Sequence, residues 1–259
     1  MNKRVRRSIA VLMWLACGAT HAAPAVEAAG APVRVGVTRG VHAEILDEVK
    51  RVAAARGLPV DVVVFDDATR IDGALADGRI DAASFEDAQR LAATRAAKGY
   101  ALTAVATTVT LPMALYSRKL KSLNALRPGA TIAIPADPRG MARALVLLQN
   151  DTLLTFRDRA GLHASLRDVT GNRLGLKIAA LDTAAFVVLD SGDAARAGLQ
   201  PARDSIGIED ARSPYADVLA VRDADRAQPW VARLVAAYQS DDVARFILTR
   251  YQDSVRRPW

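Results

Sequence analysis

A strand that runs directly into a helix, at residues 130–150 (ATIAIPADPRGMARALVLLQN), constrains the fold more than any other feature of the chain. Residues 131–135 are rich in β-branched side chains and mostly apolar, which is typical of a strand covered on both faces. Asp137 can accept hydrogen bonds from the first free N–H groups of a helix, and Pro138 suits the first helical position. Apolar residues at helical spacing then predict a helix that packs on a sheet.

This junction also predicts a binding site for an anion. In a strand-to-helix unit the helix begins at the carboxyl end of the strand, where open α/β sheets bind their ligands. The free N–H groups and the positive end of the helix dipole favour a negative charge beside Asp137. Arg143 can reach back and bind a carboxylate in a forked geometry. From the spacing alone, pairing of Arg143 with an acidic surface residue is the simpler interpretation.

Alternating strands and helices extend over the rest of the chain. A strand at residues 33–37 precedes a helix at 42–56, and a second strand follows at 60–65, which indicates a parallel sheet. The further elements predicted by composition and periodicity are strands at 80–85, 112–116, 176–180 and 184–189, and helices at 71–77, 86–98, 153–167, 193–197, 229–239 and 241–251. The sequence therefore predicts an α/β fold.

Two long extended segments are candidates for connections between two halves of the molecule. Residues 100–110 are β-branched and uncharged, and residues 215–222 (YADVLAVR) form a second apolar strand much later in the chain. A chain of 259 residues, of which 51% are hydrophobic, can bury a core as one domain or as two lobes. Strands as long as these can pass from one lobe to the other.

The first 22 residues have the build of a secretory signal peptide. A basic start precedes a short apolar stretch and small residues, and the apolar stretch is too short to span a membrane. Cleavage before Ala23 would release a soluble periplasmic protein. Alternatively, the sequence Leu15-Ala16-Cys17 is similar to a lipobox, in which case Cys17 would carry a lipid anchor. Residues 23–32, rich in Ala and Pro, are predicted to be a flexible tether in both cases.

Charge and motifs exclude several classes of function. The net charge is +7, but four basic residues lie in the first ten positions, and the remaining 31 basic and 28 acidic residues leave only +3. A nucleic-acid partner therefore has little support. Cys17 is the only cysteine, and His42 and His163 lie far apart, so we expect neither a disulfide nor a multi-histidine metal site. No cofactor or catalytic motif is present, so we expect no cofactor and no enzymatic activity.

Four segments in order, LYSRKLKSLNAL, IAIPADPRGMARALVLLQ, SPYADVLAVR and VAAYQSDDVARFI, resemble the NlpA/MetQ family of periplasmic methionine-binding lipoproteins, which deliver amino acids to an ABC importer. The resemblance runs from about Val33 almost to the C-terminus. It implies a two-lobed type II periplasmic binding fold, with mixed, mostly parallel sheets and two crossover strands. Residues 33–111 and 216–259 would form lobe 1, and residues 112–215 would form lobe 2.

The resemblance also implies candidate ligand-binding residues. Arg143 matches the arginine that holds the ligand carboxylate, and Phe85 matches an aromatic wall of the pocket. Asp190 stands where relatives carry a ligand-binding Asn, and a carboxylate can pair with an α-amino group at least as well. Asp87 stands where relatives have His. Thr110, at the first crossover, and Asp137, at the helix start, complete the predicted set.

Other pocket positions differ from the family. Leu111 and Val109 replace aromatic residues, and Ala136 and Gly140 replace two Asn residues. A thioether gains from contact with aromatic rings, so their loss weakens the case for methionine as the ligand.

The main hypothesis is a monomeric, exported solute-binding protein that presents a small amino acid or carboxylate to the permease and ATPase subunits of an ABC importer. One alternative is a degenerate relative that has lost its ligand and serves as an envelope or interaction lipoprotein. Another is an enzyme built on the same fold, for example a dehydratase that uses Asp87 or Asp190 as an acid. The last has least support, because neither acid has a visible catalytic partner in the sequence.

The two interpretations of Cys17 predict different behaviour on detergent partitioning. If Cys17 is acylated, the Cys17→Ser protein should move from the membrane fraction to the soluble fraction, because the lipid anchor is lost. Release of the wild-type protein into the soluble fraction, unchanged by the substitution, would instead support cleavage before Ala23.

Overall fold

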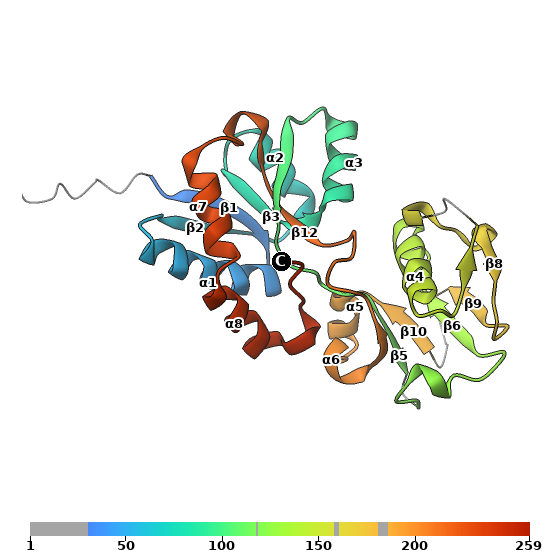
Figure 1. The fold of residues 1–259 in the computed structure, drawn as a ribbon. Helices are drawn as coiled ribbons and strands as arrows, with labels where there is room; N and C mark the ends of the chain where they lie inside the picture. Colours follow the sequence, from blue (N-terminus) through green and yellow to red (C-terminus); the bar gives the residue numbers. More distant parts are fainter. Residues whose placement is uncertain (1–30, 118, 158–160, 181–185) are drawn as a thin grey trace, which may run out of the picture.

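The computed structural model describes residues 31–117, 119–157, 161–180 and 186–259. These residues form two α/β lobes, each built on a mixed five-stranded sheet (Figure 1). The predicted two-lobed fold with mixed sheets is thus confirmed. The predicted signal peptide, Cys17 and most of the tether lie outside the described residues. Among the helices that are described, none combines the length and the apolar character needed to cross a membrane.

Lobe 1 contains a sheet with the strand order β2-β1-β3-β12-β4. Its strands are β2 (Val60–Phe65), β1 (Val33–Thr38), β3 (Ala82–Asp87), β12 (Asp217–Arg222) and β4 (Leu102–Thr107). The first three are parallel to one another, whereas β12 is antiparallel to both of its neighbours. Although β12 lies far along the chain, it fills an interior position of the sheet, so lobe 1 requires both ends of the sequence.

The lobe 1 helices bury apolar faces on this sheet. They are α1 (Val41–Ala55), α2 (Ile71–Ala76), α3 (Ala88–Lys98), α7 (Pro229–Tyr238) and α8 (Asp241–Tyr251). In α1, Ile45, Leu46 and Val49 are fully buried and belong to one core cluster with Val35 and Val37 of β1. The pattern follows from the helical spacing of these residues and from the alternation along the strand.

Lobe 2 contains a sheet with the strand order β11-β5-β10-β6-β9. Its strands are β11 (Ser205–Ile208), β5 (Ala114–Ser117), β10 (Phe186–Leu189), β6 (Thr131–Ile134) and β9 (Lys177–Ala180). Here β5 is the antiparallel strand. The helices are α4 (Pro138–Asn150), α5 (Ser191–Arg196) and α6 (Pro201–Asp204). The N-cap of α4 is as predicted, because the Asp137 side chain accepts a hydrogen bond from the Gly140 N–H at 2.8 Å.

Two predicted helices differ from the structure. No α-helix spans the described part of residues 153–167, which holds β7 (Thr155–Phe156) and two short 3-10 helices, Gly161–His163 and Leu166–Asp168. The strand β7 pairs with β8 (Val169–Gly171). Leu153, Leu154 and Phe156 are all buried, so their apolar character belongs to an irregular core segment rather than to a helical stripe. The helix predicted from residue 86 begins instead at Ala88, because β3 continues through Asp87, which caps the helix.

Two crossovers, at residues 108–113 and 209–216, join the lobes, and the C-terminal tail lies beside them (Figure 1). Thr110 and Arg256 exchange two backbone hydrogen bonds of 2.8 and 2.9 Å. The Thr110 hydroxyl donates to the Ala211 carbonyl at 2.6 Å, and Trp259 Nε1 donates to the Thr108 carbonyl at 2.6 Å. The hinge between the lobes therefore consists of both crossovers and the tail.

The packing of β1 predicts a steep cost for one added methyl group. A Cβ at Gly36 would lie 2.4 Å from Ile80 Cδ1 and 3.3 Å from Ile71 Cγ2. We expect Gly36→Ala to lower the free energy of unfolding by about 1–3 kcal/mol through overpacking. Gly73→Ala in α2 is the matched control, since its nearest contact is 3.4 Å and helix propensity favours Ala by about 0.5–1 kcal/mol. Urea unfolding that shows no loss for Gly36→Ala would contradict this packing.

Candidate functional site

A cavity of about 210 Å³ lies between the lobes and is lined by side chains from both. Its lining is largely charged, with contributions from β3, α3 and β12 of lobe 1 and from α4 and α5 of lobe 2. Phe85, Leu111 and Tyr215 add apolar surface. The cavity lies at the ends of the strands, where α/β folds place their ligands.

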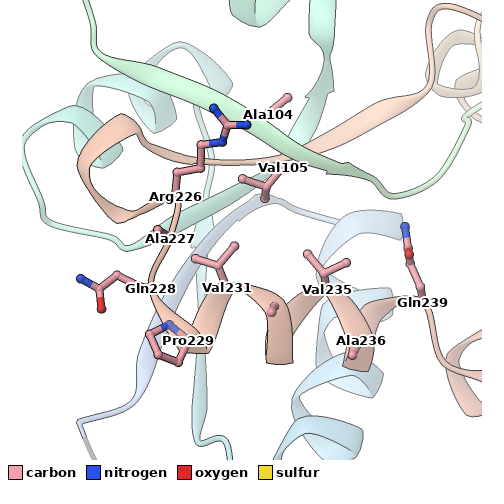
Figure 2. A pocket seen from close by; sticks show the side chains of 11 residues that line it. Ala104, Val105, Arg226, Ala227, Gln228, Pro229, Val231, Val235, Ala236 and Gln239 are labelled. Atoms are coloured by element: carbon pink, nitrogen blue, oxygen red, sulfur yellow. The ribbon is translucent and has the colours of Figure 1, made fainter.

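A larger groove of about 680 Å³ lies within lobe 1, between β4 and α7. Figure 2 shows Val231 and Val235 of α7 on one side of it and Val105 of β4 on the other, with Arg226 at one end. Small apolar side chains dominate its lining, and lobe 2 contributes nothing to it. The cavity between the lobes is therefore the better candidate for a ligand that both lobes enclose.

Arg143 reaches this cavity from α4, and a buried carboxylate holds it there. Its Nε donates to both carboxylate oxygens of Glu209, at 3.1 and 3.2 Å, and its Nη2 donates to Glu209 and to the Leu111 carbonyl. Its guanidinium carbon lies 4.9 Å from the centre of the Tyr215 ring, within range of a cation–π contact. No partner among the described residues contacts Nη1, so this group is available to a ligand.

Glu209 lies in the second crossover and is only 4% exposed. Besides Arg143, it accepts hydrogen bonds from the Met113 N–H at 3.1 Å and from the Ser213 hydroxyl at 2.8 Å. These contacts join α4 to both crossovers, so the position of the guanidinium is fixed by the hinge.

Arg139 connects the two lobes directly. From the first turn of α4 its Nη2 donates to the Asp87 carboxylate, at the end of β3 in lobe 1. Asp87 also accepts two hydrogen bonds of 3.0 Å from the first N–H groups of α3. The carboxylate is therefore fully engaged by the protein, as a helix cap and as the partner of Arg139.

Asp217 and His42 form a buried hydrogen-bonded pair on the lobe 1 side. His42 Nε2 donates to Asp217 Oδ2 at 2.9 Å, and the Thr38 hydroxyl lies 2.7 Å from His42 Nδ1. A carboxylate can only accept, so the proton of this bond lies on Nε2. The pair orients one oxygen of Asp217 and leaves the other, Oδ1, without a partner among the described residues.

The remaining predicted site residues lie in different places. Asp190 and Phe85 line the cavity, and Asp190 Oδ1 accepts a hydrogen bond of 2.8 Å from the Asp193 N–H. Thr110 and Asp137 do not line it: Thr110 is buried in the hinge, and Asp137 is an exposed helix cap. The hydroxyl and the carboxylate instead serve the backbone, so the structure does not bring these two residues together with the rest of the predicted set.

Glu86 lies beside the cavity with its carboxylate enclosed. Among the residues that the structure describes, neither of its oxygens has a hydrogen-bond partner, and its side chain is 4% exposed. Burial raises the pKa of Glu86 to about 8, and the nearby Asp72 carboxyl adds to the rise. Arg90 Nε lies 3.3 Å from Glu86 Oε2, and its positive charge opposes this rise in pKa. Burial likewise raises the pKa of Asp72 above its ordinary value.

Several lining residues were not predicted, and the sheet topology explains why. The family resemblance pointed to Asp87 and Asp190. Asp217 lies at the amino end of β12. Because β12 is antiparallel to β3, this end pairs with Asp87 and lies at the same sheet edge. His42, Glu209 and Tyr215 carried no signal of their own in the sequence.

Two α/β lobes that are joined by two crossovers and enclose a charged cavity define a periplasmic solute-binding protein. The chain belongs to the NlpA lipoprotein family, whose model matches residues 33–259. This is a family of binding proteins and not of enzymes. The resemblance seen in the sequence is thus confirmed.

Individual relatives agree with this assignment. D-methionine-binding lipoprotein MetQ of Escherichia coli K12 is 35% identical over 223 residues, which cover 82% of each chain. Lipoprotein 28 of the same organism is 33% identical and covers 88% of each chain. The solved structure of a nutrient binding protein from Burkholderia cenocepacia bound to methionine is 35% identical, with a TM-score of 0.72, and the match covers 88% of this chain and 100% of that one.

A Coxiella burnetii structure, described as a periplasmic substrate-binding protein of an ABC transporter, is also similar. It is 34% identical with a TM-score of 0.73, and the match covers 87% of this chain and 99% of that chain.

The raised pKa of Glu86 predicts that stability falls as the pH rises. Between the ordinary glutamate pKa and about 8, the folded protein keeps a proton that the unfolded chain releases, so the free energy of unfolding declines by at most about 1.4 kcal/mol per pH unit. The window from pH 6 to 8 is the most informative for Glu86. Burial raises the pKa of Asp151 to about 6, so Asp151 changes the stability mainly below this window. Glu86→Gln should flatten the decline.

Denaturant unfolding at pH 6, 7 and 8 measures this effect. Glu48→Gln, which removes the ion pair between half-buried Glu48 of α1 and exposed Arg51, should keep the wild-type slope. Parallel curves for the wild type and Glu86→Gln would show that Glu86 does not hold a proton in the folded state.

Proposed function

We propose that this protein closes its two lobes on a small amino acid or related carboxylate and presents that solute to an ABC importer. The observation that carries the proposal is the charged cavity, to which both lobes contribute side chains. Closure around a ligand excludes water and strengthens each ionic contact inside. A zwitterion suits such a cavity because it presents both signs of charge.

Arg143 is the proposed site for the ligand carboxylate. Its Nε edge is occupied by Glu209, whereas Nη1 remains for the cavity. Glu209 and Tyr215 hold the guanidinium in place before a ligand arrives, which reduces the entropy cost of binding. A charge-assisted hydrogen bond to a prepositioned donor is a strong contact.

The α-amino group of the ligand would lie against the acidic side of the cavity. Asp190 from lobe 2 and Asp217 from lobe 1 each have one oxygen without a partner among the described residues. Phe85 provides one apolar wall, and Tyr215 provides another. A ligand in this position would touch both lobes, so its binding would favour the closed form.

Methionine is the first ligand to test, because the Burkholderia relative binds it and the MetQ relatives are named for it. The lining supports an additional preference for polar ligands, since only Phe85, Leu111 and Tyr215 offer extended apolar surface. A thioether side chain gains mainly from apolar and aromatic contacts. We therefore infer that the cavity has diverged from a methionine site.

The proposed partners are the permease and ATPase subunits of an ABC importer, as the Coxiella relative's description implies for that protein. A periplasmic location follows from the predicted export signal. The family of lipoproteins supports a lipid anchor through Cys17, which lies outside the described residues.

The contacts already present in the cavity favour a second candidate function. Arg139 pairs with Asp87 across the lobes, and Glu209 accepts hydrogen bonds from Nε and Nη2 of Arg143. Internal partners thus satisfy charges that a ligand would otherwise meet. A relative that has lost ligand binding and acts as an envelope lipoprotein would show this arrangement. A thermal-shift screen of amino acids and small carboxylates distinguishes the two, because only a binding protein is stabilised by a ligand.

Substitution of Arg143 tests the carboxylate site. For methionine, or for the amino acid that gives the largest thermal shift, we expect Arg143→Ala to weaken binding about a hundredfold, equivalent to about 2–3 kcal/mol. Arg143→Ala also leaves Glu209 buried without its partner, so it should lower the melting temperature. Arg143→Lys keeps a positive charge beside Glu209 but removes the forked donor, and should still bind at least about tenfold more weakly.

Calorimetry on these variants separates binding from stability. Arg250→Ala is the matched control, because Arg250 is exposed on α8 and pairs with Glu44, and neither residue lines the cavity. Wild-type affinity in both Arg143 variants would remove this residue from the site.

A further inference from the structure

The cavity between the lobes has an unbalanced charge. Three guanidinium groups face it, and each lies within ion-pair distance of one carboxylate. These pairs are Arg90 with Glu86, Arg139 with Asp87 and Arg143 with Glu209. Two further carboxylates line the cavity, on Asp190 and Asp217, and no described guanidinium group pairs with either. The lining therefore carries more carboxylates than guanidinium groups.

Asp190 and Asp217 approach the cavity from opposite lobes. Each uses one oxygen inside the protein, Asp190 for the N–H of Asp193 and Asp217 for His42. The second oxygen of each has no partner among the residues that the structure describes. Asp217 is only 8% exposed, so this oxygen has little contact with bulk water. Because Asp217 lines the cavity, a ligand enclosed there can reach this residue.

Burial of a carboxylate is unfavourable unless its charge is balanced, and the penalty grows when a second carboxylate lies nearby. Asp217 has His42 and the charge of Arg139 near it, but no described guanidinium group within ion-pair distance. Protonation of Glu86 does not remove the imbalance of the whole cluster, because Asp87, Asp190, Asp217 and Glu209 remain beside three guanidinium groups, although Glu209 lies behind Arg143 and not in the lining itself. A simple zwitterion adds one positive and one negative charge and leaves the balance unchanged. A ligand with one more positive charge would neutralise the closed cavity.

We propose, on the basis of the solute-binding function above, that the ligand is an amino acid whose side chain carries a second cationic group, such as an amine or a guanidine. Its carboxylate faces Arg143 Nη1, and its two cationic groups face Asp190 and Asp217. Each acid then forms a charge-assisted hydrogen bond with the ligand. The two acids determine the specificity of the site for basic amino acids.

Calorimetry with matched ligands tests this proposal on the mature protein. Ornithine and norleucine have side chains of the same length. Ornithine carries an ammonium group where norleucine has its terminal methyl group. We expect ornithine or lysine to bind at least about tenfold more tightly than norleucine or methionine. Tighter or equal binding of norleucine or methionine would overturn the proposal while leaving a solute-binding function intact. If none of the four binds, both the proposal and the amino-acid-binding function fail.

Substitutions show whether the two acids cause the preference. Asp190→Asn and Asp217→Asn keep the shape of the side chain and remove one negative charge each, from lobe 2 and lobe 1 respectively. Each should reduce the ratio of ornithine to norleucine affinity by about fivefold or more. Asp47→Asn, on the exposed side of α1, removes the same charge away from the cavity and should leave the ratio unchanged. A ratio that neither cavity variant alters would overturn the assignment of these residues.

Discussion

The buried ion pair of Arg143 and Glu209 is the interaction on which the rest of the site depends. It joins a lobe 2 helix to the second crossover, and Glu209 also accepts a bond from the first crossover at Met113. Loss of one partner of such a pair leaves an uncompensated charge in the interior, at a cost of about 3–5 kcal/mol. The guanidinium is therefore fixed relative to the hinge.

Antiparallel strands β12 and β5 bring together residues that are far apart in the sequence. Each lies inside a sheet of otherwise parallel strands, so its amino end lies beside the carboxyl end of a neighbouring strand. In lobe 1 this arrangement pairs Asp217 with Asp87, and in lobe 2 it pairs Ala114 with Leu189. Both crossovers enter these strands. A change in lobe position would thus act directly at the edges that form the cavity.

The sequence predicted most strands and helices, because their periodicity and caps are local properties. Asp137 and Pro138 define the start of α4, and the hydrophobic alternation of β1 identifies its buried face. The site was predicted less completely. Arg143, Asp190, Phe85 and Asp87 line the cavity, but Thr110 and Asp137 serve the hinge and a helix cap. Asp217 pairs with Asp87, which lies 130 residues earlier (217 minus 87), and Glu209 contacts Arg143 and Met113 across 66 and 96 residues. Local patterns do not encode contacts at such separations.

The distribution of charge separates the part of the cavity that supports the fold from the part that can select a ligand. Glu209 and Asp87 satisfy backbone N–H groups and guanidinium groups within the protein, so their replacement would disturb the hinge or a helix cap. Asp190 and Asp217 each keep one oxygen free among the described residues. Substitutions at such positions can change the preferred ligand while the lobes and their connection are retained, which is how one fold comes to serve several solutes.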